Sequence, residues 1–277
     1  MRNLDCGLSL QANPTSLKGV HKSRESKALE VAKGGVLCNA KTSLNMNRPL
    51  QPIYLLADSY LLFWRDEANR LLSSIRELIS DRAPKAAYIG ASNGDDLQFY
   101  AIFEAAMEGV GVRDCRMILS SFSADDRDFL NEADLILLAG GDVQKGWRVL
   151  KEVGIGDFVL RRYSAGAVLV GVSAGAVQLG LYGLIEAEDS FNVLIDTFKL
   201  VPFMVGAHEE KQDWAGLRRA VELLDGSAIG IGIPAGGGLV YHPDRSIEAI
   251  RHPVFEISMS SGLASDNLLF PTWKPKE

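Results

Sequence analysis

The stretch that decides the fold is AVLVGVSAGAVQLG, residues 167–180. Residues 167–172 are apolar throughout, which predicts a buried strand. The small residues from Ala174 onward predict a helix that packs tightly on the resulting sheet. Ser173 lies between the two, flanked by Gly171 and Gly175. Glycines at these positions permit a sharp strand-to-helix turn, because they carry no Cβ atom that would clash.

A serine in such a turn points to a specific chemistry. The pattern G-x-S-x-G between a strand and a helix is typical of a nucleophile elbow, which projects the serine hydroxyl from the rim of the sheet. The backbone amide of Ala174 then faces the position of a developing oxyanion, helped by the helix N-terminus. Ser173 is therefore predicted to be the nucleophile of a hydrolase. The alternative is an ordinary glycine-serine turn, since the pattern also arises by chance.

A serine nucleophile needs a base, and the base needs an orienting acid. Of the four histidines, His208 is the best candidate, because it follows the apolar run 201–207 and a glycine-containing turn. His21 lies in the N-terminal segment, and His242 and His252 lie among turns near the C-terminus. The carboxylates between nucleophile and base are Glu186, Glu188 and Asp189, and slightly later Asp196. Spacing alone does not choose among them.

The turn Gly140-Gly141-Asp142 ends another apolar run, 134–139. Its amides are candidates to complete an oxyanion hole with Ala174. Asp142 is also suited to be the N-cap of a following helix. The two interpretations are compatible.

Continuous apolar strands alternate with helical patterns from residue 51, which predicts a parallel sheet covered on both faces. Both glycine-marked turns are then expected on one rim, at the carboxyl ends of the strands. After residue 225 short alternating runs predict an antiparallel meander at one edge of the sheet. The expected strands are 53–57, 86–91, 116–119, 134–139, 167–172, 229–233, 239–242, 246–250 and 254–258, and the expected helices are 61–80, 96–110, 143–152 and 156–163.

Residues 1–50 differ from the rest of the chain in composition. They hold eight basic residues against three acidic ones and no aromatic residue. We expect a disordered extension there, followed by a single α/β domain over 51–277. An organellar targeting peptide is the minority interpretation; otherwise a cytoplasmic location is expected.

Composition excludes several classes of function. The net charge of −6 argues against general binding to nucleic acid or anionic membranes. A membrane span would need about 18 consecutive apolar residues, and the chain has no such run. The three cysteines, Cys6, Cys38 and Cys115, are scattered and indicate neither a zinc site nor a disulfide framework. We expect no metal and no cofactor.

Several segments in the same order carry a family resemblance: LILLAGGDVQKGWRVL, VGVSAGAVQLG, KLVPFMVGAHEE, and LRRAVELL followed by AIGIGIP. Over about residues 52–250 the chain resembles the peptidase E and cyanophycinase family of serine peptidases. The resemblance implies a flavodoxin-like three-layer sandwich, similar to the core of class I glutamine amidotransferases with serine in place of cysteine.

The resemblance also implies roles for single residues. The family nucleophile falls on Ser173, the base on His208 and the triad carboxylate on Glu188, with Glu186 and Asp189 as substitutes. The oxyanion donors fall on the amides of Gly141 and Ala174. Asp142 and Arg219 fall on substrate-binding positions; an arginine there is suited to a substrate carboxylate, although a surface ion pair is an equal alternative.

Departures from the family bear on the substrate: Ala235 stands where the family commonly has glutamate, and Ala207 and Glu209 flank His208 where proline or threonine and an aromatic residue are expected. The expected activity is that of an aspartyl dipeptidase or small-peptide exopeptidase, acting as monomer or homodimer on a small peptide. The alternatives are a cyanophycinase-like peptidase with another substrate, an esterase, and a catalytically degenerate binding protein on the glutamine amidotransferase-like scaffold.

Overall fold

The computed structural model of the chain describes residues 48–66, 69–79, 82–186, 192–260 and 263–271. All of them belong to one compact unit of the chain. At its beginning, the guanidinium of Arg48 lies 3.1 Å from a carboxylate oxygen of Asp134. The contacts of the domain therefore include a residue slightly before residue 51.

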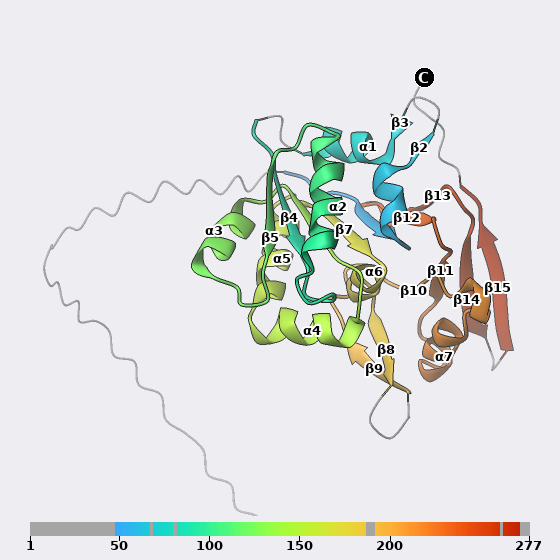
Figure 1. Ribbon diagram of the computed structural model, residues 1–277. Coiled ribbons are helices and arrows are strands. Elements are labelled where there is room, and N and C mark those ends of the chain that lie inside the picture. Colours follow the sequence, from blue (N-terminus) through green and yellow to red (C-terminus); the bar gives the residue numbers. More distant parts are fainter. Residues whose placement is uncertain (1–47, 67–68, 80–81, 187–191, 261–262, 272–277) are drawn as a thin grey trace, which may run out of the picture. The chain divides into compact units, whose positions relative to one another are not determined.

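A seven-stranded sheet, in the order β13-β12-β1-β7-β6-β4-β5, forms the centre of this unit (Figure 1). The five strands from β1 to β5 in this order are parallel, and β12 and β13 add antiparallel strands beside β1. The strands are β1 Ile53–Leu56, β4 Lys85–Ile89, β5 Asp114–Ile118, β6 Leu135–Leu138, β7 Val168–Val172, β12 Gly238–Tyr241 and β13 Ile247–Ile250. The predicted mostly parallel sheet is confirmed.

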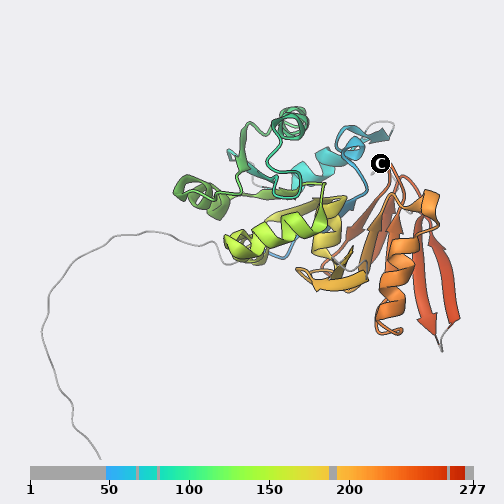
Figure 2. The same cartoon turned by 60° about the horizontal axis from the view of Figure 1, so that its bottom comes forward.

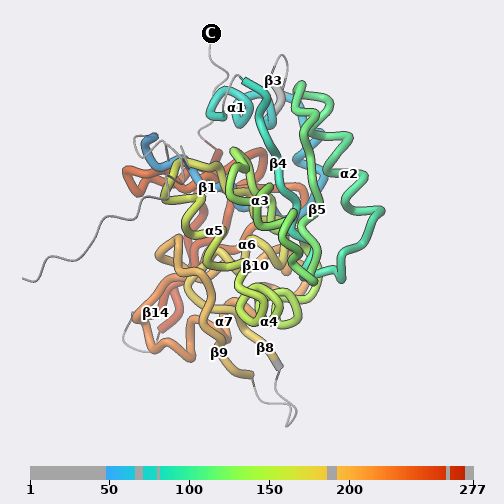
Figure 3. Tube along the Cα trace, turned by 90° about the vertical axis from the view of Figure 1, so that its left-hand side faces the viewer, coloured from blue at the N-terminus to red at the C-terminus, as the bar shows by residue number. Residues whose placement is uncertain are grey.

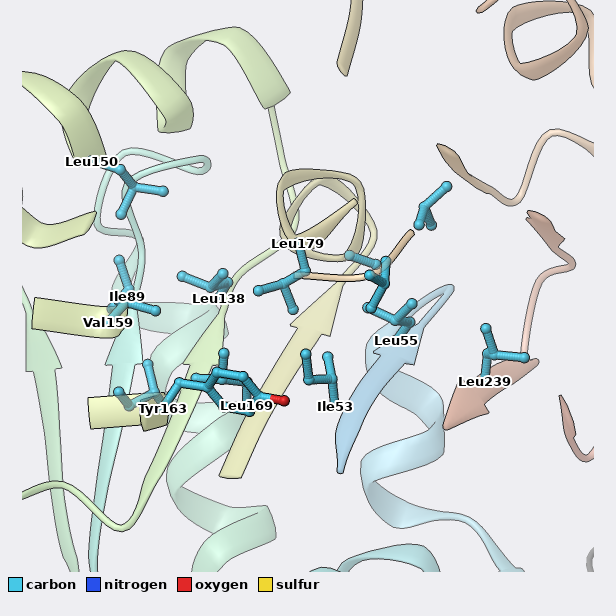
Figure 4. Packing of buried hydrophobic residues seen from close by; sticks show 14 of the residues in the cluster. Ile53, Leu55, Ile89, Leu138, Leu150, Val159, Tyr163, Leu169, Leu179 and Leu239 are labelled. Carbon is cyan, nitrogen blue, oxygen red and sulfur yellow. The ribbon is translucent and has the colours of Figure 1, made fainter. Parts of the chain in front are cut away.

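Side chains of the parallel strands alternate between two apolar layers. Ile53 and Leu55 of β1 belong to one cluster of buried residues, whereas Tyr54 and Leu56 belong to the other. Figure 4 shows the first cluster, in which Leu179 of helix α6 and Leu150 of α4 lie over the strands. Because both faces of the sheet are buried, the sequences of these strands are continuous apolar runs.

Helices cover both faces of the sheet. Helices α3 to α6 contribute to the first cluster, and α1 and α2 to the second. Figure 2 shows the teal helix α2 and the yellow-green helix α4 on opposite sides of the strands. The helices are α1 Leu71–Leu78, α2 Leu97–Glu108, α3 Ala124–Glu132, α4 Val143–Glu152, α5 Ile155–Ser164, α6 Ala174–Leu179 and α7 Ala215–Leu223, with short 3₁₀ turns Ser59–Phe63 (η1) and Glu210–Gln212 (η2).

A second, four-stranded sheet has the order β10-β11-β14-β15 and comprises Met204–Ala207, Gly230–Ile233, Val254–Ser260 and Leu263–Leu269. The predicted antiparallel strands near the C-terminus are confirmed, with β12 and β13 at the edge of the central sheet. Strands β11 and β14 lie in the second sheet instead, where β11 pairs in parallel with β10. Gly230 and Gly232 leave room for helix α7: an added Cβ would lie 2.9 Å from Leu217 and 2.7 Å from the Trp214 ring.

Two local predictions also differ from the structure. The helix predicted over 61–80 begins only at Leu71, because Asp58 caps the 3₁₀ turn η1 and Trp64 then adopts an extended backbone. Short strands β2 (Arg65–Asp66) and β3 (Asn69–Arg70) follow. Helix α3 was not predicted; a capping box of Ser123 and Asp126 begins it.

A hairpin of β8 (Tyr182–Glu186) and β9 (Asn192–Asp196) follows α6 and lies near the lower edge in Figures 1 and 3. In the described ranges, no helix has the length and apolar character needed to cross a bilayer.

Candidate active site

Ser173 stands at the end of β7, in a strained turn. Its backbone has φ 48° and ψ −109°, values that residues with a side chain rarely adopt. A Cβ atom on Gly171 would lie 2.7 Å from the Ala176 backbone, and one on Gly175 would lie 2.1 Å from the Leu138 carbonyl oxygen. Both glycines are therefore required by close packing of α6 on the strands. The Ser173 side chain makes no capping bond and stays free for another partner.

That partner is His208. The Ser173 Oγ lies 2.8 Å from Nε2 of His208. The fold brings them together in two steps. The amide of Leu181, just after α6, donates to the carbonyl oxygen of Phe203. Strand β10 then runs back beside α6, so that the residue after β10 reaches the start of the helix.

The backbone at His208 fixes its position. Its amide donates to the Ile233 carbonyl oxygen at 2.9 Å, and its φ is 49°. The imidazole is exposed to solvent on one side and lines the same cavity as Ser173.

The turn after β6 lies directly beside the nucleophile. A Cβ on Gly140 would lie 3.4 Å from the Ser173 Cβ, and Gly141 has φ 133° with no room for a side chain beside the Ser92 carbonyl. Among the described residues, no hydrogen-bond acceptor is recorded for the amides of Gly141 and Ala174. Both amides are thus free to bind a substrate oxygen.

Asp142 serves as the N-cap of α4. Its Oδ1 accepts a hydrogen bond of 2.8 Å from the Lys145 amide, and its own amide donates to the Ser92 carbonyl oxygen. The side chain does not line the cavity beside Ser173. A substrate-binding role for Asp142 stays a prediction.

The predicted triad carboxylate, Glu188, lies outside the described residues, as does Asp189. Glu186 ends β8, and its side chain is also outside what the structure describes. Asp196 pairs with Lys199 at 2.6 Å, and this lysine lowers the pKa of the Asp196 carboxyl. Within the described ranges, no carboxylate is recorded in contact with the His208 ring.

Arg219 lies on α7, where its guanidinium is 3.1 Å from Glu222. Half of the Arg219 side chain is exposed, and it lines neither cavity near Ser173. The structure thus places it in a surface ion pair; the substrate-binding role stays a prediction.

A cavity of about 220 Å³ opens beside Ser173 and His208. It lies between η1, the start of α2 and the ends of β4, β6 and β7. Its lining residues are Ala57, Asp58, Ser59, Leu62, Tyr88, Asn93, Phe99, Ile102, Phe103, Leu137, Ala139, Gly140, Gly141, Val172, Ser173 and His208.

Ala235 lines a second cavity, which shares Asp58 with the first and also contains Arg251 and His252. The Asp58 carboxylate accepts hydrogen bonds from the amides of Tyr60 and Gly236. Asp58 thereby ties the loop after β11 to the end of β1, next to the nucleophile.

Sequence reasoning missed Asp58 and the cavity face of α2. Asp58 follows the end of β1, and the rule that sites form at the carboxyl ends of parallel strands would have found it. The α2 residues show no such signal, because an apolar helix face predicts packing, not a cavity wall.

The comparison with protein-family models supplies the family. Residues 47–247 match the model of Peptidase family S51. The chain belongs to this family. It is therefore a serine-type peptidase, as the sequence motifs predicted. A search of curated proteins gave no match.

Two solved structures of peptidases share the fold of the chain. A peptidase from an acI-B1 actinobacterium superimposes with a TM-score of 0.60 at 18% identity, covering 81% of this chain and 96% of that one. A proposed peptidase E from Listeria monocytogenes EGD-e superimposes with a TM-score of 0.54 at 16% identity, covering 73% of this chain and 99% of that one. At these identities the likeness concerns the fold.

Proposed function

We propose that this S51 peptidase hydrolyses small peptides with Ser173 as nucleophile and His208 as general base. The single observation that carries the proposal is the 2.8 Å contact between Ser173 Oγ and His208 Nε2 at the rim of the sheet. A serine hydroxyl is a weak nucleophile until a base at hydrogen-bond distance takes its proton.

The chemistry follows from this pair. Ser173 Oγ attacks the substrate carbonyl carbon while its proton passes to Nε2 of His208. The amides of Gly141 and Ala174 donate to the resulting oxyanion. The imidazolium returns the proton to the leaving amine as the C–N bond breaks. Water then hydrolyses the acyl-serine ester by the same steps, which releases the acid and restores the hydroxyl.

A carboxylate on Nδ1 would orient the imidazole and stabilise the imidazolium. We assign this role to Glu188, with Glu186 and Asp189 as substitutes, on the family resemblance alone. We assign a small peptide as substrate on the family resemblance; the cavity beside Ser173 measures about 220 Å³, less than the roughly 300–1,000 Å³ of pockets for drug-sized ligands, and so holds only part of a peptide.

The test is hydrolysis of a dipeptide and tripeptide panel by wild-type and Ser173→Ala proteins. We expect the substitution to reduce kcat by at least about 10³-fold, because it removes the attacking atom. Ser164→Ala, at the exposed end of α5, is the matched control and should retain full activity. Equal turnover by the Ser173→Ala protein would refute the proposal.

A further inference from the structure

The cavity beside Ser173 is apolar on most of its surface. One helix contributes a whole wall: Phe99, Ile102 and Phe103 of α2 line it together. Their spacing of three and four residues places them on one face of the helix. Phe103 is buried, but Phe99 keeps 49% of its surface exposed and Ile102 keeps 37%. Two large apolar side chains thus face the cavity without an apolar partner on that side.

Other lining residues are apolar as well. Leu62 comes from η1, and Leu137 and Val172 come from β6 and β7. Two of the polar lining residues are already paired with each other: the Asn93 side-chain amide donates to the Tyr88 hydroxyl at 2.8 Å. Burial raises the pKa of this hydroxyl, which therefore stays neutral.

Asp58 carries the fixed charge among the described residues that line the cavity. No lysine or arginine is among its lining residues in the part of the chain that the structure describes. Asp58 stands at the rim, held by amide hydrogen bonds of 2.9 Å from Tyr60 and 2.6 Å from Gly236. A carboxylate entering this cavity would lose its water and meet an anion instead of a cation, which is unfavourable.

We propose that this cavity receives an apolar side chain of the substrate, of leucine or phenylalanine type, and discriminates against aspartate and glutamate. The inference rests on the proposed function, since it specifies the substrate of the same site. The side chain belongs to the residue whose carbonyl Ser173 attacks, because that residue is held closest to both Ser173 and Gly141, which border the cavity. The volume suits one side chain.

The first experiment measures kcat/KM for matched dipeptides X–Ala, in which X is Leu, Phe, Asp or Glu. We expect the Leu and Phe substrates to exceed the Asp and Glu substrates by about 100-fold or more, the size of effect that pocket contacts produce. Equal or faster hydrolysis of Asp–Ala would overturn the inference while leaving Ser173 hydrolysis intact.

A charge placed on the α2 wall should change the preference. Ile102→Arg is expected to lower kcat/KM for Leu–Ala by about 10-fold or more and to raise it for Asp–Ala, because the new cation replaces apolar contact with an ion pair. Phe99→Arg, at the other exposed position, gives a second variant should the first fail to fold. An unchanged ratio of the two substrates in the folded variant would contradict the proposed pocket.

Leu97→Arg is the matched control. Leu97 lies on the same helix and is 70% exposed, but it does not line the cavity. The same substitution there should leave the Leu-to-Asp ratio within about twofold. An equal shift in this control would show that net charge, not the cavity, sets the ratio, and would overturn the inference.

A binding measurement on an inactive variant tests the side-chain preference of the cavity independently of peptide hydrolysis. Calorimetric titration of the Ser173→Ala protein with Leu–Ala and Asp–Ala should give the tighter Kd for Leu–Ala by about 10-fold or more. Preferential binding of Leu–Ala without turnover by the wild type would uphold the pocket and refute the proposed hydrolysis. Equal binding of both peptides would overturn the specificity even if hydrolysis is found.

Discussion

Ser173 and His208 meet across the two sheets of the domain. Ser173 follows β7 of the seven-stranded sheet, and His208 follows β10 of the four-stranded sheet, yet Oγ and Nε2 lie 2.8 Å apart. Helix α6 connects the two in space. It starts just after Ser173, and the residue Leu181 beyond its end is hydrogen-bonded to Phe203, just before β10. The geometry of the pair therefore depends on how tightly α6 packs on the central sheet.

Replacing the base should remove most of the activity. His208→Gln is expected to reduce kcat by about 10³-fold or more, because glutamine cannot take the Ser173 proton. The double variant with Ser173→Ala should be no slower than either single one, since residues that act as a unit are non-additive. Steady-state kinetics on one good dipeptide measure both. His242→Gln, which disrupts a surface contact with Glu248 at 3.3 Å, is the control. Additive losses in the double variant would mean that the two residues act separately.

The orienting carboxylate can be found by amide substitution. Glu188→Gln is expected to lower kcat by about 10²- to 10⁴-fold, whereas Glu186→Gln and Asp189→Asn should stay within a few-fold of the wild type. Removing the anion leaves the imidazolium without its stabilising partner. A large effect at Glu186 or Asp189 instead would reassign the role. Small effects at all three would show that none of them is the triad acid.

The elbow glycine Gly175 should contribute strongly to the stability of the fold. Gly175→Ala places a Cβ 2.1 Å from the Leu138 carbonyl oxygen, so α6 must move away from the sheet. We expect a loss of about 3 kcal/mol or more in the free energy of unfolding by urea, at the upper end of overpacking effects.

Gly156→Ala in α5 provides the comparison. The nearest atom to its added Cβ lies at 3.4 Å, so the helix gains propensity of up to about 1 kcal/mol without a clash. Equal stability of the two variants would contradict the close packing of α6.

A surface ion pair gives a pH-dependent prediction. Arg218 on α7 binds both carboxylate oxygens of Asp266 on β15, at 2.8 and 2.6 Å, and lowers the pKa of that carboxyl. A lowered pKa stabilises the fold above the unfolded value of about 3.9, and this stability is lost as the pH falls through the folded value.

Asp266→Asn should therefore cost about 0.5–1 kcal/mol at pH 7, a small effect because the pair is partly exposed. The difference should shrink below about pH 4, measured by urea unfolding at both pH values. Asp128→Asn, at an exposed position of α3, is the control for the amide substitution itself. A cost for Asp266→Asn that persists at low pH would assign it to packing and not to charge.

The central sheet and the nucleophile turn were predictable because local patterns encode them. Strands buried on both faces must be apolar throughout, so β1, β6 and β7 appear directly in the sequence. The elbow at Ser173 is largely local: Gly171 is required by a contact with Ala176 inside the strand-turn-helix unit, whereas Gly175 is required by the neighbouring strand β6 at Leu138.

The second sheet and the cavity were not predictable in this way. Whether β11 joins the central sheet or β10 depends on the position of helix α7 over Gly230 and Gly232, and no local pattern contains that information. The cavity wall on α2 was also not predictable, because Phe99 and Ile102 have the spacing of ordinary core residues. Only the tertiary structure shows that they face an open space.

The most direct test of the account is covalent labelling of the nucleophile. The wild-type protein is treated with a fluorophosphonate probe, digested, and mapped by mass spectrometry. The account predicts one major adduct, on Ser173, which becomes at least about 10²-fold slower to form in the His208→Gln protein because the hydroxyl loses its base. An unlabelled Ser173, or an adduct that forms equally fast without His208, would contradict the claim that these two residues form the catalytic pair.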